Sequence, residues 1–167
     1  MNTRVAIIGG GLAGTEAAWQ LSLLGIPSCL YEMRPKVKTA AHKTSLLAEL
    51  VCSNSFRSDD DEFNAVGQLH WEMRKSKGLI ISVGDKTRIP AGSAMAVDRE
   101  KFSSQITEMI RNNPLIDLVN EEVHDLNLLD FNEIIMATGP LTSRNLLNSA
   151  GKFTESKNLF FYDAIAP

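Results

Sequence analysis

The sequence predicts a doubly wound α/β fold with a mainly parallel sheet. A glycine-rich turn at residues 9–14 lies between an apolar run at residues 5–8 and an alanine-rich helical pattern, which is the order of strand, tight turn and helix. A second apolar run at residues 133–136 passes directly into Ala-Thr-Gly, so another buried strand is expected to end in small residues. Two such strands in one parallel sheet place their turns at the same edge, and we expect helices on both faces.

The first helix is expected to begin at Thr15 and to end before Gly25 and Pro27, which are helix stop signals. Its apolar residues recur at helical spacing at Ala13, Ala17, Ala18, Leu21 and Leu24. A short apolar run at residues 29–31 then predicts the second strand, and this strand ends at Glu32.

The middle of the chain is harder to assign. Residues 33–66 form a polar segment with little periodicity, and long irregular segments in compact domains are usually functional or disordered. Within it, the acidic run at residues 59–62 is expected to be a solvated loop. Residues 67–77 are expected to be helical, whereas the apolar run at residues 79–83 fits either the end of that helix or a strand.

The last third of the chain returns to regular patterns. Asp98 is expected to cap a helix that ends before Pro114. One face of this helix would carry Phe102, Ile106, Met109 and Ile110. Short strands are expected at residues 116–119 and at Val123, a buried strand at residues 133–136, and a last strand at residues 159–162.

Length and charge set limits on function. A chain of 167 residues is about one domain, and a net charge of −3 gives no overall basic field for binding nucleic acid. No stretch is long and apolar enough to span a membrane, and no signal peptide precedes the first strand. Cys29 and Cys52 make no disulfide framework, and no histidine spacing indicates a metal site. These features predict a cytoplasmic protein.

The glycine turn has the pattern of a Rossmann-like dinucleotide site. Gly9 would serve the turn, Gly11 would let the backbone approach a pyrophosphate, and Gly14 would let helix and strand pack closely. The helix N-terminus adds free N–H groups and partial positive charge for the phosphates. The residues expected to contact the cofactor here are Gly9, Gly10, Gly11, Leu12, Ala13 and Gly14.

Two further features narrow the choice between FAD and NAD(P). Glu32 follows the second strand, where an acid accepts hydrogen bonds from ribose hydroxyls and repels a 2′-phosphate. Thr138 and Gly139 end the strand at residues 133–136, where small residues let backbone lie close to the nucleotide. The combination of the glycine turn with this later strand end favours FAD over NAD, so residues 1–167 are predicted to be an FAD-binding domain.

Several longer strings are more specific than the glycine turn. The string Glu-Leu-Val-Cys-Ser-Asn-Ser at residues 49–55 resembles the folate- and FAD-dependent tRNA uracil-5-methyltransferase family, and it separates that family from the related FAD protein that modifies the tRNA wobble uridine. Further matching strings run in order along the whole chain, at residues 31–35, 41–44, 48–58, 64–67, 89–92, 96–99, 137–143 and 161–167.

The resemblance implies a reductive methylation. Members of the family transfer a one-carbon unit from 5,10-methylenetetrahydrofolate to C5 of the T-loop uridine of tRNA. FAD reduced by NADPH or NADH supplies the electrons that convert methylene to methyl. A variant of the family methylates a uridine of ribosomal RNA, and the residues here do not separate the two RNA substrates.

Cys52 matches the cysteine of the family string and is the predicted catalytic residue. Uracil C5 becomes nucleophilic after a group adds at C6, and a thiolate suits this addition because it is a good nucleophile and leaves again. Arg57 could stabilise that thiolate or meet an RNA phosphate. Alternatively, Cys52 is a small buried residue that packs under the flavin. A second cysteine implicated in catalysis lies in a part of the family that is absent here.

Other residues keep two interpretations. Arg34 would contact adenine or ribose, or be a solvated arginine, and His42 would touch the flavin or pyrophosphate, or be an ordinary loop histidine. Trp71 stands where an acidic residue is expected, and it would either pack on its helix or stack a base. Ser93 replaces an expected glycine and would add atoms where backbone passes close to the cofactor.

The largest departure from the family is length. Its members continue beyond Pro167 with a substrate domain and a carboxy-terminal segment that completes the FAD site. We therefore expect the isolated chain to be inactive, because the site cannot enclose donor, flavin and RNA. A non-enzymatic FAD-binding remnant, a wobble-uridine modifier and an FAD oxidoreductase remain as alternatives.

Overall fold

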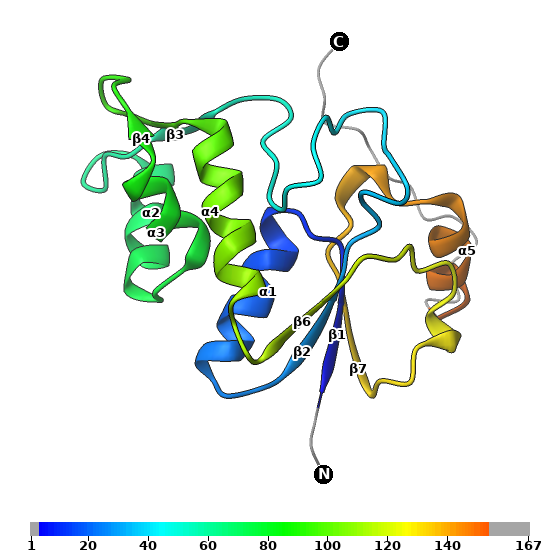
Figure 1. The fold of residues 1–167 in the computed structure, drawn as a ribbon. Helices are drawn as coiled ribbons and strands as arrows, with labels where there is room; N and C mark the ends of the chain where they lie inside the picture. Colours follow the sequence, from blue (N-terminus) through cyan, green and yellow to red (C-terminus); the bar gives the residue numbers. More distant parts are fainter. Residues whose placement is uncertain (1–3, 154–167) are drawn as a thin grey trace.

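The centre of the fold is a parallel four-stranded sheet (Figure 1). The computed structural model describes residues 4–153, so the strand expected at residues 159–162 lies outside the described residues. The strands are β1 (Val5–Ile8), β2 (Ser28–Tyr31), β6 (Ile116–Val119) and β7 (Glu133–Met136), in the order β6-β2-β1-β7. All three neighbouring pairs are parallel, which confirms the predicted sheet with the first strand inside it.

Helices cover both faces of this sheet, as predicted for a doubly wound fold. On one face lie α1 (Leu12–Leu23) and α4 (Arg99–Arg111), and on the other lie the short η1 (Leu126–Leu128) and α5 (Arg144–Phe153) (Figure 1). Because successive strand residues point to opposite faces, Ile7 belongs to the core under α1, whereas Ile8 packs in the smaller core under α5.

The first helix begins three residues earlier than predicted, at Leu12 rather than Thr15. Gly11 is its N-cap residue, and the Thr15 hydroxyl donates to the Gly11 carbonyl oxygen at 2.8 Å. The early start places the last part of the glycine turn inside the first helical turn, so the N–H groups of Leu12 and Ala13 belong to the helix terminus.

A small antiparallel sheet lies beside α4 and was not predicted (Figure 1). It consists of β3 (Ser55–Ser58), β5 (Ala94–Val97) and the two-residue β4 (Arg88–Ile89), in the order β3-β5-β4. It packs with α2 (Ala65–Lys75) and α3 (Leu79–Lys86). Leu79 starts a separate helix, so both alternatives for residues 79–83 were wrong: these residues are neither the end of α2 nor a strand.

The segment at residues 33–66 is less irregular than expected. It contains β3, and its Leu47 and Ala48 are fully buried in the main core. Part of the segment therefore packs in the core of the domain, and the segment is not simply a polar surface loop. The N-terminal cap of α4 was predicted correctly, since the Asp98 carboxylate accepts from the Lys101 N–H at 3.1 Å.

Two strand predictions near the end of the chain were wrong in detail. Val123 is buried, but it forms no strand and packs instead under α5. Strand β7 is not buried on both faces, because it is the edge of the sheet among the described residues and leaves Ile135 and Met136 more than a third exposed. Within residues 4–153 no helix is long and apolar enough to cross a membrane.

Candidate functional site

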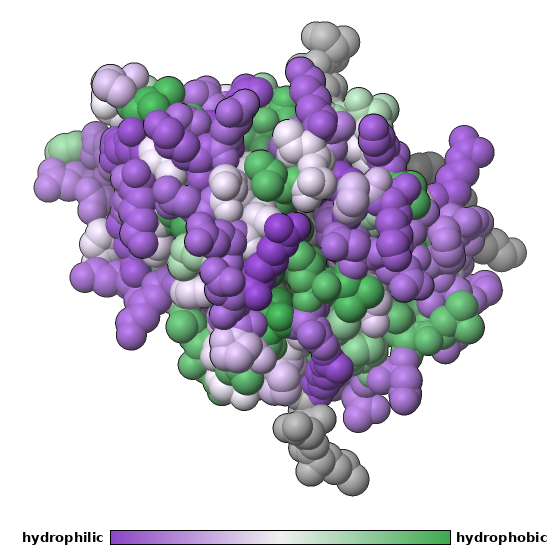
Figure 2. Space-filling model, viewed as in Figure 1, coloured by the Kyte–Doolittle hydropathy of each residue, from purple (hydrophilic) through white to green (hydrophobic). Residues whose placement is uncertain are grey.

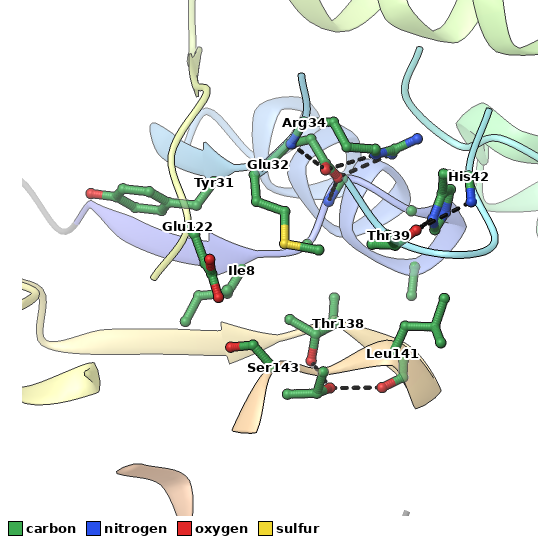
Figure 3. Close-up of a pocket in the computed structure, with 18 of the residues that line it drawn as sticks. Ile8, Tyr31, Glu32, Arg34, Thr39, His42, Glu122, Thr138, Leu141 and Ser143 are labelled. Atoms are coloured by element: carbon green, nitrogen blue, oxygen red, sulfur yellow. Dashed lines mark hydrogen bonds and ion pairs between the residues drawn. The ribbon is translucent and has the colours of Figure 1, made fainter. Parts of the chain in front are cut away.

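A cavity of about 400 Å³ opens where β1, β2 and β7 end at their carboxyl sides, a size within the range of small-molecule sites (Figure 3). Its lining brings together nearly all of the residues predicted from sequence. These are Gly9, Gly10, Gly11, Leu12, Ala13, Glu32, Arg34, Cys52, Thr138 and Gly139. Gly14 alone of the predicted set is not part of the lining.

Gly9 and Gly14 hold the turn closed. Gly9 has a φ of +107°, and a Cβ there would lie 2.6 Å from the Ala137 carbonyl oxygen. A Cβ at Gly14 would overlap the Gly9 carbonyl oxygen. Gly14 therefore acts beneath the cavity, where it lets α1 pack against the end of β1, as its predicted role requires.

Gly11 has a different reason to lack a side chain. Its φ of −77° and ψ of −167° are extended backbone that any residue adopts, and no atom lies within 4 Å of an added Cβ. The space in front of Gly11 is therefore open, and no side chain caps the N-terminus of α1. Uncapped N–H groups at a helix N-terminus facing a cavity are the usual setting for a bound phosphate.

Glu32 is buried and bonded within the protein (Figure 3). One carboxylate oxygen accepts from the Gly10 N–H at 2.9 Å, and the other accepts from Arg34 Nε at 2.8 Å. Burial alone would raise the pKa of Glu32, but the hydrogen bonds from Arg34 and Gly10 outweigh it and hold the pKa below its ordinary value. The carboxylate is thus a fixed anion at the end of β2.

Arg34 is not the solvated arginine that the sequence left open. Its side chain is 4% exposed and forms ion pairs with Glu32 and with Glu49, the latter at 3.1 Å. Glu49 was not singled out from sequence, although it begins the string at residues 49–55. Its ion pair with Arg34 could not be predicted from sequence, because only the fold brings residues 34 and 49 together.

His42 lines the cavity and is half-buried. Its Nδ1 lies 2.5 Å from the Thr39 hydroxyl. Burial first, and then the charge of Arg34, lower the pKa of His42 below its ordinary value, so the ring is neutral near pH 7. A neutral imidazole at the cavity can donate or accept one hydrogen bond.

The opposite wall of the cavity comes from the residues after β7 (Figure 3). The hydroxyls of Thr138 and Thr142 are 2.5 Å apart, and Thr142 donates to the Gly139 carbonyl oxygen at 2.7 Å. The Ser143 hydroxyl is buried and has no hydrogen-bond partner among the described residues. A buried hydroxyl without a partner is costly, and this one lines the cavity.

Cys52 is exposed and lies on the cavity lining, which disagrees with the alternative that it is a buried packing residue. Its carbonyl oxygen accepts from Arg99 Nη2 at 3.4 Å. Cys29, by contrast, is buried in β2, and burial raises the pKa of its thiol. Both cysteines are free, as predicted.

The remaining sequence expectations lie away from the cavity. Asp59 is not solvated, because its carboxylate is 10% exposed and binds His70, Arg74 and Arg88. Ser93 is exposed, lies next to β5 in the small sheet and is absent from the cavity lining, so it adds no atoms there.

Figure 2 shows hydrophilic residues over much of the viewed face, including the side where α2, α3 and β4 lie. On α2, Trp71 is 42% exposed, and the Lys75 ammonium lies 5.1 Å from the centroid of its ring. In the described part of the chain, no group of three or more His, Cys, Asp or Glu residues could hold a metal ion.

The parallel sheet, the glycine turn and the cavity at the strand ends define a doubly wound α/β domain of the Rossmann type. The chain belongs to the family described as glucose inhibited division protein A, whose sequence model matches residues 4–167.

Curated relatives are identical to this chain at about half of the aligned positions. The protein named "Methylenetetrahydrofolate--tRNA-(uracil-5-)-methyltransferase TrmFO" from Bartonella bacilliformis is 54% identical over 167 residues, which is 100% of this chain and 36% of that protein. The protein of the same name from Cereibacter sphaeroides is 52% identical over 167 residues, or 37% of its length. The chain thus spans little more than a third of the curated relatives that it matches.

Solved structures confirm the fold. GidA from Aquifex aeolicus superposes with a TM-score of 0.57 at 18% identity, covering 74% of this chain and 20% of that one. The GidA-related protein from Thermus thermophilus gives a TM-score of 0.52 at 12% identity, covering 91% of this chain and 68% of that one. At these identities the likeness concerns architecture alone.

Proposed function

We propose that this chain is the FAD-binding part, residues 1–167, of a folate- and FAD-dependent tRNA uracil-5-methyltransferase. The observation that carries the proposal is the cavity that places an open glycine turn and an exposed cysteine on one lining. The identity of 52–54% to proteins named as such methyltransferases supports the particular reaction. A tRNA substrate supports a cytoplasmic location of this activity.

The residues of the cavity fit a dinucleotide. Gly11 leaves open space where a side chain would otherwise stand, and the N-terminus of α1 presents uncapped N–H groups beside it. These groups would hold the pyrophosphate. Glu32, whose pKa is lowered, keeps a negative charge at the end of β2 and would face the ribose. The unpartnered Ser143 hydroxyl offers one further donor on the opposite wall.

Bound and reduced, FAD supplies the electrons that convert a folate-derived methylene group to methyl. The protein's own contribution is to hold the cofactor and to present Cys52. As an exposed thiol on the lining, Cys52 would add to C6 of a uracil that enters the cavity and would leave after C5 has reacted.

The folate donor, the NADPH or NADH that recharges the flavin, and the tRNA need surfaces beyond this cavity. The relatives are nearly three times as long as the matched region, so the rest of such a protein would supply those surfaces. Within this chain we assign only cofactor binding and the thiol.

The cofactor assignment can be tested by titrating the purified chain with FAD and following quenching of flavin fluorescence. We expect weak binding, which Gly11→Ala reduces and Gly11→Val abolishes. A side chain at residue 11 occupies the approach of the pyrophosphate, and its Cβ would have no protein atom within 4 Å. Parallel titrations with NAD distinguish the two dinucleotides.

The control for Gly11→Val is its own thermal unfolding without ligand. Since the backbone at Gly11 is extended and its surroundings are open, the loss of the glycine N-cap should cost only about 1 kcal/mol of stability. Binding of NAD with no measurable binding of FAD would refute the flavin assignment.

A further inference from the structure

Three buried charged side chains, bonded one to the next, connect the glycine turn to the segment at residues 39–52. This segment carries His42 and Cys52. The first link is Glu32, which accepts from the Gly10 N–H at 2.9 Å and from Arg34 Nε at 2.8 Å. The second link is Arg34 Nη1, which donates to a Glu49 carboxylate oxygen at 3.1 Å. These three side chains are 7%, 4% and 13% exposed in the order Glu32, Arg34 and Glu49.

Glu49 also accepts hydrogen bonds from the loop that precedes it. Its carboxylate accepts from the N–H of Lys43 at 2.9 Å, from the N–H of Thr44 at 3.1 Å and from the Thr44 hydroxyl at 3.0 Å. Burial alone would raise the pKa of Glu49, but the hydrogen bonds from Lys43 and Thr44 lower it below its ordinary value. Glu49 is therefore charged and fully engaged on both sides, with Arg34 and with the loop.

The same segment touches the turn directly. The Ala48 N–H donates to the Gly10 carbonyl oxygen at 2.9 Å, so both polar backbone atoms of Gly10 are held. A Cβ on Gly10 would lie 2.6 Å from Leu47 Cδ2. The segment rests on the glycine turn here, and Glu49 with Arg34 fixes its orientation only three residues before Cys52.

We propose that Glu49 is a positioning residue that, through Arg34, holds the segment with Cys52 over the bound dinucleotide. This inference rests on the proposed function, since it takes FAD as the ligand of the cavity. Removing the charge of Glu49 leaves Arg34 with one carboxylate instead of two. The segment then loses its ion pair with Arg34, while the hydrogen bond from Arg34 Nη1 to the Thr44 carbonyl oxygen at 3.3 Å and the Gly10–Ala48 contact remain.

The test uses the reactivity of Cys52 towards dithionitrobenzoate in the purified chain, with and without saturating FAD. In the unaltered protein, FAD should slow the labelling of Cys52 about tenfold, which corresponds to about 1.4 kcal/mol of restraint. In Glu49→Gln, with FAD raised to saturation, we expect this protection to fall to about threefold or less. The exposed acid Glu62 provides the matched control, because Glu62→Gln should leave the protection unchanged.

Cys29 separates positioning from general loosening, since it is buried in β2 and reports opening of the core. We expect it to stay unlabelled in Glu49→Gln. Thr44→Val, which removes one donor to Glu49 at an exposed residue, should lose part of the protection in the same direction and covers the case in which Glu49→Gln does not fold.

Three results would overturn the inference. They are equal protection of Cys52 in Glu49→Gln and the unaltered chain, labelling of Cys29 together with Cys52, and loss of all FAD binding in Glu49→Gln, which would make Glu49 a ligand of the dinucleotide. If the unaltered chain itself bound no FAD, the proposed function would fail, and this inference with it.

Discussion

At the scale of single residues, the glycines of the turn illustrate how one residue type serves different physical needs. Gly9 has a positive φ and Gly14 has no room for a side chain, so both are required by the fold itself. Gly11 has an ordinary backbone conformation and open space, so the fold does not require it to be a glycine. What requires it is the ligand that we propose for that space.

Removing the Ser143 hydroxyl should stabilise the ligand-free chain but weaken the binding of FAD. Its buried hydroxyl has no partner among the described residues, so Ser143→Ala should raise the stability of the ligand-free chain by about 1 kcal/mol. If the hydroxyl donates to bound FAD, the same change should weaken FAD binding about tenfold. Thermal unfolding with and without FAD measures both effects.

Ser28 is the matched control for Ser143. It is also a buried serine whose hydroxyl has no described partner, but it lies at the first residue of β2, at the opposite end of the strand from the cavity. Ser28→Ala should stabilise the chain similarly and leave FAD affinity unchanged. Equal loss of affinity in both variants would show that Ser143 has no specific role.

At the scale of elements, the local patterns predicted most of the main sheet and its helices. The runs at residues 5–8, 116–119 and 133–136 form strands because each is short and mostly apolar, and β1 is bounded by a turn that only glycine can make. The small sheet was missed because β3 alternates exposed and half-buried residues and β4 has only two. Its stability comes from contacts between distant segments, which no local pattern contains.

The same distinction separates the parts of the site. The glycines and Glu32 follow from a motif with a known mechanism, and the fold brought them together as predicted. The ion pair of Arg34 with Glu49 and the cluster around Asp59 depend on which segments the fold makes neighbours. From sequence alone, a solvated side chain was one of the two interpretations of Arg34. A solvated side chain was also the prediction for Asp59.

The Asp59 cluster links three elements, since the carboxylate follows β3, binds His70 and Arg74 of α2 at 2.9 Å, and binds Arg88 of β4 at 2.6 Å. Burial would raise the pKa of Asp59, but the hydrogen bonds from His70, Arg74 and Arg88 hold it below its ordinary value of 3.8. The unfolded chain therefore takes up this proton first as the pH falls. The stabilisation by Asp59 is present above that ordinary value and is lost as the pH falls through the lower, folded pKa.

Asp59→Asn should reduce the free energy of unfolding at pH 7 by about 2 kcal/mol, less than for a fully buried ion pair because Arg74 and Arg88 are about a third exposed. It should also flatten the decline of stability between about pH 5 and pH 2. Urea unfolding across this range provides both numbers, with the exposed Asp61→Asn as control. An unchanged acid dependence would contradict the assignment of Asp59 as the centre of the cluster.

At the scale of the whole molecule, the described residues line the cavity from the ends of β1 and β2 and from the segment after β7. Figure 3 shows Glu32 and Arg34 on one side and Thr138, Leu141 and Ser143 on the other. Transfer of a one-carbon unit needs donor, flavin and uracil to be held together away from water. Since the chain spans 36–37% of the TrmFO relatives cited above, the proposed reaction needs the remainder of such a protein.

Joining the chain to the carboxy-terminal region of a full-length relative should give methylation of a tRNA transcript, measured by transfer of labelled carbon from methylenetetrahydrofolate. In that hybrid, Cys52→Ala should lower the rate by about 10³-fold or more and leave flavin bound, because the thiolate acts on uracil rather than on FAD. Cys29→Ala makes the same chemical change in the buried strand β2 and should keep the activity.

The 167-residue chain alone should not methylate RNA, so activity of the unaided chain would mean that the cavity is sufficient. Loss of flavin rather than of turnover in Cys52→Ala would make Cys52 a structural part of the flavin pocket.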